Sequence, residues 1–113
     1  MGLTVVIQGY VVLTGIVEPE GDQYVSFCRE LGTASCGDSS DEALRNLGDA
    51  IDVHLNALEE TGELERVFRE RNIRIDVQPP GFDELSIRVP PGKVFTTYPR
   101  QVPLTGGAAV RAL

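Results

Sequence analysis

The hydrophobic and polar residues between Ser39 and Gly62 repeat with the period of an amphipathic helix. Apolar side chains recur every three or four positions and form one stripe: Ala43, Leu44, Leu47, Ala50, Ile51, Leu55 and Leu58. Ser39 and Glu42 make an S-x-x-E capping box, which can satisfy free amides of the first turn. Gly62 can end the helix in the left-handed conformation. The pattern predicts one long helix with its apolar stripe toward the core.

The residues at the start of the chain predict buried strand. Residues 3–17 are rich in Val and Ile and contain no Pro, and Gly9 or Gly15 would mark a bulge or a turn between two strands. The stretch is interrupted by Gln8 and Thr14 and is shorter than the ~20 apolar residues of a membrane span. No Lys or Arg precedes it, which is unlike a secretory signal. We therefore expect strand and no membrane segment.

Two further short strands are predicted before the helix. Pro19 and Gly21 supply the turn of a hairpin whose second arm is YVSFC. In that arm Val25 and Phe27 point to one side, which is the better candidate for the core. A reversal that ends at Gly32 leads to the strand TASC. Together these strands form an antiparallel meander.

The second half of the chain predicts smaller elements. Residues 63–72 form a second, shorter helix with three buried side chains, Leu64, Val67 and Phe68. Three short strands, IRIDV, LSIRV and KVFTTY, follow between proline-rich turns. We expect one α+β domain over residues 1–103, in which the meander packs on the long helix and the second helix and short C-terminal strands are added. Residues 104–113 are predicted to be a frayed tail.

Composition fits a single globular domain with an aliphatic core. The chain has 113 residues, is 42% hydrophobic and 24% charged, and contains no Trp. Cys28 and Cys36, with a single His in the chain, cannot build an ordinary structural zinc site. A disulfide across the hairpin is one option, but two reduced, partly buried thiols are favoured. We therefore predict a cytoplasmic protein.

The negative charge is concentrated in the first part of the chain. Residues 1–65 hold 13 acidic and 2 basic side chains, whereas residues 66–113 hold 4 acidic and 8 basic ones. Such a front half repels nucleic-acid phosphate and can steer a basic partner toward itself, although acidic helix faces also serve solubility alone. The polar side of the long helix supplies the predicted partner interface: Asp41, Arg45, Asp49, Asp52 and Glu59.

No pattern in the sequence indicates an enzyme. His54 lies beside the apolar stripe, where a packing or hydrogen-bonding role is expected rather than a base. No Ser or Cys lies in a nucleophile-elbow pattern, and the glycines form no phosphate-binding loop. We predict no catalytic residue, no cofactor and no metal. The basic residues of the second half show no helix-turn-helix pattern, so no direct DNA-binding motif is seen.

The segment ELGTASCGDSSDEALRNLGDAI resembles the HicB-like antitoxin family. That family combines a YxAxxPDLPG-like strand and turn, a GC-x-x-GDT turn, and EEAL-x-N-x-x-EAI on the helix. The matching residues cover roughly a third of the chain: Tyr24, Val25, Leu31, Gly32, Gly37, Asp38, Ser39, Asp41, Glu42, Ala43, Leu44, Asn46, Ala50 and Ile51. Arg29 and Glu30 replace the usual Pro-Asp, and Cys36 is displaced from the usual Gly-Cys. We find no appended DNA-binding segment, so the chain looks like a stand-alone HicB-like domain.

The resemblance implies a βββαβ core, similar to a degenerate RNase H-like fold without its catalytic acids. It also implies a function, the neutralisation of HicA, a small basic RNA-cleaving toxin. An acidic domain is compatible with that role because it can mimic RNA. The alternatives are an orphan structural or regulatory domain that forms a homo-oligomer through a strand edge, and a metal-dependent nuclease.

Overall fold

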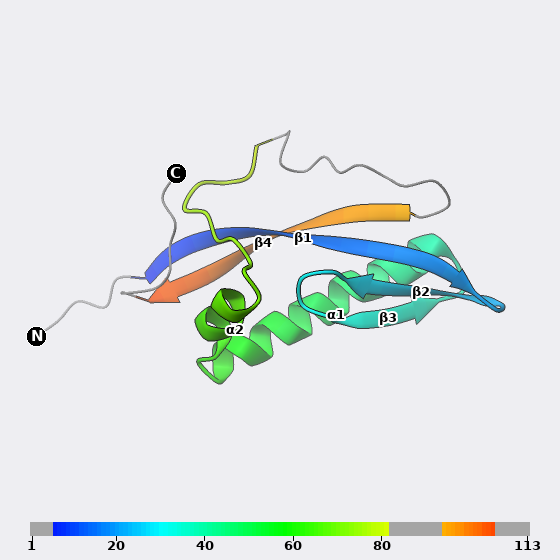
Figure 1. Ribbon diagram of the computed structural model, residues 1–113, viewed down its shortest axis with the longest axis horizontal. Helices are drawn as coiled ribbons and strands as arrows, with labels where there is room; N and C mark the ends of the chain where they lie inside the picture. The colour runs from blue at the N-terminus through cyan, green and yellow to red at the C-terminus, as the bar shows by residue number, and fades with distance from the viewer. Residues whose placement is uncertain (1–5, 82–93, 106–113) are drawn as a thin grey trace, which may run out of the picture.

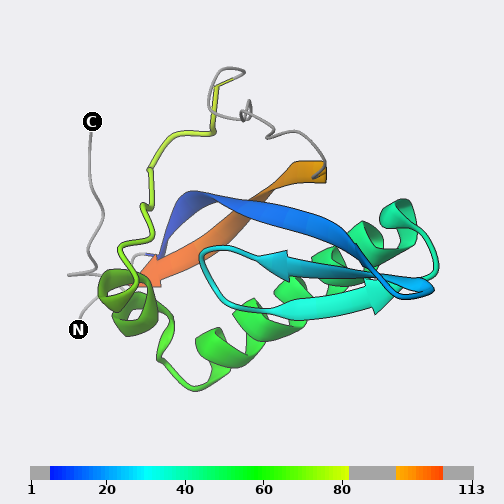
Figure 2. The same cartoon turned by 45° about the vertical axis from the view of Figure 1, so that its right-hand side comes forward.

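A four-stranded antiparallel sheet and two helices make up the part of the chain that the computed structural model describes, residues 6–81 and 94–105 (Figure 1). The elements in chain order are β1 (Val6–Glu20), β2 (Gln23–Cys28), β3 (Ala34–Gly37), α1 (Ser40–Glu60), α2 (Leu64–Glu70) and β4 (Val94–Thr105). The strand order is β3-β2-β1-β4. Helix α1 runs along one face of the sheet (Figure 2). The predicted α+β class and the meander of β1, β2 and β3 are confirmed. Neither helix in the described ranges is long and apolar enough to cross a membrane.

Strand β1 is one continuous element, and the predicted bulge or turn within it is wrong. Its pairing with β4 runs without interruption from Val6 opposite Thr105 to Val17 opposite Val94. Gly15 serves another purpose, because a Cβ atom at this position would lie 2.4 Å from Cε2 of Tyr98. The glycine therefore provides space for an aromatic ring from the neighbouring strand rather than a break in the backbone.

The hairpin turn between β1 and β2 is tighter than predicted. Glu20 pairs directly with Gln23, so the loop contains only Gly21 and Asp22, and Gly21 has a φ of 60°. Two-residue loops with positive φ match the twist of antiparallel strands. The predicted turn role of Pro19 is wrong, because this residue pairs with Tyr24 inside the strand.

The core face of β2 is the opposite of the predicted one. Ser26 and Cys28 are buried beneath α1, whereas Val25 and Phe27 lie on the other side of the sheet and are only half-buried. A serine can occupy the core because its hydroxyl donates a 2.7 Å hydrogen bond to the carbonyl oxygen of Ala43 on α1. Hydropathy misassigned the strand because both of its faces contain apolar side chains.

The predicted long helix is confirmed, with Ser39 as its N-cap, although the second bond of the capping box goes to Asp38 rather than to an amide of the first turn. The hydroxyl of Ser39 accepts a 3.1 Å hydrogen bond from the amide of Glu42, while the Glu42 carboxylate reaches the amide of Asp38 at 3.4 Å. Gly62 follows the helix with a φ of 71°. The buried side of α1 joins the two helices and the sheet in one core, formed by Val11, Leu13, Cys28, Leu31, Leu47, Ile51, Leu55, Leu64, Phe68, Ile73, Ile75 and Val102.

The segment after α2 differs from the predicted row of short strands. Ile73 and Ile75 are buried as the alternation predicts, but the segment forms only one bridge, between Asp76 and Tyr10. The bridge lies on the part of β1, before Gly15, that β2 does not cover, and it consists of the two backbone hydrogen bonds between Tyr10 and Asp76. Strand β4 continues through the predicted start of the frayed tail to Thr105. The predicted strand LSIRV and residues 106–113 lie outside the described residues.

The two cysteines lie on opposite faces of the sheet, so the disulfide across the hairpin is excluded by geometry. Cys28 faces α1 and is buried, whereas Cys36 pairs with Val25 on the other face. Both thiols are free, but the prediction of partial burial is wrong for Cys36, which is exposed. Burial raises the pKa of the Cys28 thiol, and the nearby Glu30 carboxylate adds to the rise.

Gly15→Ala should lower the free energy of unfolding by about 1–3 kcal/mol, because the added methyl group collides with Tyr98. Urea denaturation measures this loss, which should be smaller in a Tyr98→Ala background. The matched control is Gly81→Ala, where an added methyl group would have no atom within 4 Å, and it should leave stability nearly unchanged. An equal loss with and without the Tyr98 ring would contradict the packing described.

Under native conditions one thiol per chain, that of Cys36, should react rapidly with a disulfide reagent such as dithionitrobenzoate. Cys28 should react only on unfolding, and Cys36→Ser should abolish the fast phase. Because the pKa of Cys28 is raised in the folded state, stability in the Cys36→Ser variant should fall as pH rises above the usual thiol value. Two fast thiols would show that the buried face is wrongly assigned.

Candidate partner-binding surface

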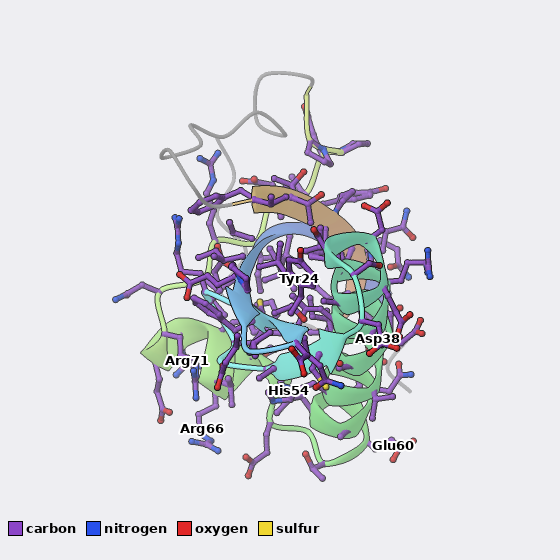
Figure 3. All side chains as sticks on the ribbon, turned by 90° about the vertical axis from the view of Figure 1, so that its right-hand side faces the viewer. Tyr24, Asp38, His54, Glu60, Arg66 and Arg71 are labelled. Atoms are coloured by element: carbon purple, nitrogen blue, oxygen red, sulfur yellow. The ribbon has the colours of Figure 1, made fainter. Side chains whose placement is uncertain are left out.

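The five residues predicted to form an interface lie together on the exposed side of α1. Asp41, Arg45, Asp49, Asp52 and Glu59, which we call the outer stripe of α1, are all exposed. At about 100° per residue they fall within an arc of about 80°, and they extend about 27 Å along the helix axis. In Figure 3, Asp38 and Glu60, near the two ends of α1, lie on the helix side of the molecule, away from Arg66 and Arg71.

Hydrogen bonds between α1 and the sheet fix the rotation of the helix. The Ser26 hydroxyl binds the carbonyl oxygen of Ala43 from below, and the side-chain amide of Asn46 donates a 2.8 Å hydrogen bond to the carbonyl oxygen of Cys36 on β3. These contacts tie α1 to the neighbouring strands β2 and β3. They hold the helix with its buried side on the sheet and with the side chains of the outer stripe exposed.

Arg100 on β4 joins the outer stripe, and sequence reasoning did not predict this. Its Nε atom lies 2.6 Å from the Asp52 carboxylate, and its guanidinium lies 5.5 Å from the centre of the Tyr98 ring. The Tyr98 hydroxyl donates a 2.6 Å hydrogen bond to the Leu44 carbonyl oxygen, and partial burial raises its pKa. Tyr98 and Arg100 lie at alternate positions of β4, together with buried Val102, so the strand period could have placed Arg100 beside α1. The stripe is consequently less acidic than the helix sequence suggests.

A shallow depression of about 350 Å³ lies between the first turns of α1 and β4. Leu44 and the Tyr98 ring supply apolar surface, Thr96 adds a hydroxyl, and Asp41 and Arg45 carry the charges. An aromatic and aliphatic floor with charges at its edge is the type of pocket that receives an anchoring side chain in protein interfaces. The depression therefore extends the outer stripe of α1 onto the sheet.

His54 has a local structural partner. Its Nδ1 atom lies 2.7 Å from the hydroxyl oxygen of Thr33, which ties α1 to the turn before β3. This contact fits the packing and hydrogen-bonding role predicted for it. Among the residues that the structure describes, no three His, Cys, Asp or Glu side chains are grouped to hold a metal ion.

The arginines of α2 and its following segment contact nearby groups rather than α1. Arg66 forms ion pairs with Glu63, which immediately precedes α2, and with Glu70 of its own helix. Arg71 donates a 3.2 Å hydrogen bond to the carbonyl oxygen of Leu31, which fastens the end of α2 to the turn before β3. The arginines of α2 could either form a solvent-exposed face or pair with acidic residues of the first half of the chain. These contacts favour a solvent-exposed face whose arginines bond groups close to them.

Comparisons with protein-family models, curated proteins and solved structures gave no match to this chain. The HicB-like resemblance of the segment from Tyr24 to Ile51 therefore remains a prediction from its residues. The fold class and the geometry of α1 do not depend on it.

Proposed function

We propose that this protein is a non-enzymatic binding protein that uses the outer stripe of α1 to bind a basic RNA-binding partner. In the terms of the HicB-like resemblance, the partner is a small, basic, RNA-cleaving toxin and the protein is its antitoxin. The observation that supports the proposal is the row of exposed carboxylates along one side of a rotationally fixed helix. Asp41, Asp49 and Glu59 supply charge that an Arg- or Lys-rich surface can pair with.

The acidic surface continues from α1 onto the hairpin. The side-chain amide of Gln23 lies 3.5 Å from the Asp38 carboxylate, which brings the hairpin tip beside the start of the helix. Glu20 and Asp22 at that tip are exposed, as is Asp41 in the first helical turn. Such a surface speeds the encounter with a basic protein and repels RNA. A partner that binds RNA could therefore release the RNA and bind this protein in its place.

The alternative is an orphan domain that self-associates through a strand edge. It is disfavoured because backbone hydrogen-bonding groups at the edges of the described sheet are missing or already bonded. Pro99 and Pro103 lie opposite Val12 and Gln8 on β1. They are four residues apart on β4, so their backbone nitrogens point in the same direction. Proline is tolerated in a strand where its nitrogen faces away from the paired neighbour, so both remove a donor from the edge of β4 that no strand of the described residues covers. On β3 the Cys36 carbonyl is already bonded by Asn46, as described above. Both edges are poor templates for another strand.

Replacing carboxylates of the outer stripe should weaken binding to the product of an adjacent small basic reading frame. We expect Asp49→Lys with Glu59→Lys to raise the dissociation constant at least about tenfold and to abolish rescue of growth on co-expression. The reason is that two attractive charges become repulsive. Calorimetry at low and high salt should also show that the dissociation constant of the variant depends less on salt than that of the native chain.

Glu63→Lys with Glu70→Lys is the matched control, because it reverses two exposed carboxylates at α2, as the test variant does on α1. It should leave the affinity within about twofold. The proposal fails if no basic partner binds, or if the α1 and α2 variants weaken binding equally.

A further inference from the structure

The guanidinium of Arg100 lies against three different residues of α1 and β4. Its Nε atom is 2.6 Å from the Asp52 carboxylate, and its central carbon is 5.5 Å from the centre of the Tyr98 ring. The third residue is Gly48, where an added Cβ atom would lie 3.6 Å from Nη2 of Arg100. We call Gly48, Asp52 and Tyr98 the guanidinium cradle. A carboxylate beside an aromatic ring offers a guanidinium both an ion pair and a cation–π contact.

The fold itself sets the shape of the cradle. Gly48 lies inside α1, where glycine weakens a helix relative to alanine, and a Cβ atom there would be only 3.2 Å from Cε1 of Tyr98. The Tyr98 ring is fixed by the 2.6 Å hydrogen bond from its hydroxyl to the Leu44 carbonyl oxygen. Asp52 follows Gly48 by four residues and so lies on the same side of the helix. The positions of the ring and the helix are therefore set by contacts that do not involve Arg100.

The contact between Arg100 and the cradle is open to solvent. The side chains of Arg100 and Asp52 are 27% and 51% exposed. Ion pairs with this exposure contribute little net stability and are screened by salt. Arg100 can therefore leave the cradle at a small cost in free energy, and the Asp52 carboxylate and the Tyr98 ring then become available to another cation.

The cradle lies within the surface proposed to bind a basic partner. Asp52 belongs to the outer stripe of α1, and Tyr98 lines the depression beside that stripe. An Arg-rich partner brings to this surface the same chemical group that Arg100 already places in the cradle. While Arg100 stays there, it neutralises Asp52 and covers the Tyr98 ring. A guanidinium of the partner must therefore compete with it.

We infer that the guanidinium cradle binds an arginine side chain of the basic partner, and that Arg100 occupies this site in the free protein. The partner's arginine replaces Arg100 beside Asp52 and over Tyr98. Arg100 thus acts as an internal competitor, which lowers the affinity by the fraction of molecules whose cradle it fills. The cradle favours arginine over lysine, because an ammonium lacks the planar fork that stacks on a ring. The partner rests on the proposed function, whereas the site is testable without one.

Ethylguanidinium titrated to about 100 mM into the isotope-labelled Arg100→Ala variant tests the site. The amide shifts of Gly48, Asp52 and Tyr98 should change and saturate, and the native chain, whose cradle is filled, should bind at least about threefold more weakly. Ethylammonium has the same charge without the planar fork and should also bind at least about threefold more weakly. Asp52→Asn in the same background should abolish the saturable change. Circular dichroism verifies that each variant is folded.

Arg100→Lys keeps the native charge and is the matched variant for binding of the basic partner. It should lower the dissociation constant about twofold, because an ammonium fills the cradle less well, and Arg100→Ala should lower it at least about threefold. Equal partner affinities of the native chain and Arg100→Lys would overturn the inference. So would equal binding of ethylguanidinium to the native chain and Arg100→Ala, or no change at the cradle residues. If no partner binds, the proposed function fails, and the ethylguanidinium titration still decides whether the cradle takes a guanidinium.

Discussion

The packing of α1 against one face of the sheet is the contact on which the rest of the structure depends. It buries Leu47 and Ile51 completely. Gly15 on β1 and Gly48 on α1 both leave space for the ring of Tyr98. The ring in turn bonds the helix through its hydroxyl and supports Arg100. The position, rotation and partial neutralisation of the exposed side of α1 all follow from this one interface.

Two different surfaces result from that arrangement. On the helix side, hydrogen bonds from Ser26 and Asn46 hold the carboxylates outward, in a place where electrostatic steering can act. On the opposite side, the sheet has a second apolar surface, with Ile16 enclosed by aromatic rings and Arg29. The two surfaces do not compete for the same residues.

Local signals in the sequence predicted local structure well, and contacts between distant segments decided the rest. The S-x-x-E box, the apolar stripe and Gly62 predicted the limits and the exposed side of α1. They could not decide between the two apolar faces of β2, because that choice depends on a hydrogen bond from Ser26 to a residue 17 positions away. Likewise, Arg100 reaches Asp52 only because β4 pairs with β1. Gly15 and Pro19 are typical of a break and a turn, yet both lie inside β1, where the neighbouring strands determine their role.

If the outer stripe of α1 is the partner surface, amide chemical-shift mapping should show it directly. The product of an adjacent small basic reading frame is titrated into the isotope-labelled chain. The perturbed amides should cluster at Asp41, Arg45, Asp49, Asp52 and Glu59, while those of Val25 and Phe27, whose side chains lie on the face of the sheet opposite α1, stay unaffected. Perturbations confined to β2 and β4, with α1 unchanged, would contradict this assignment.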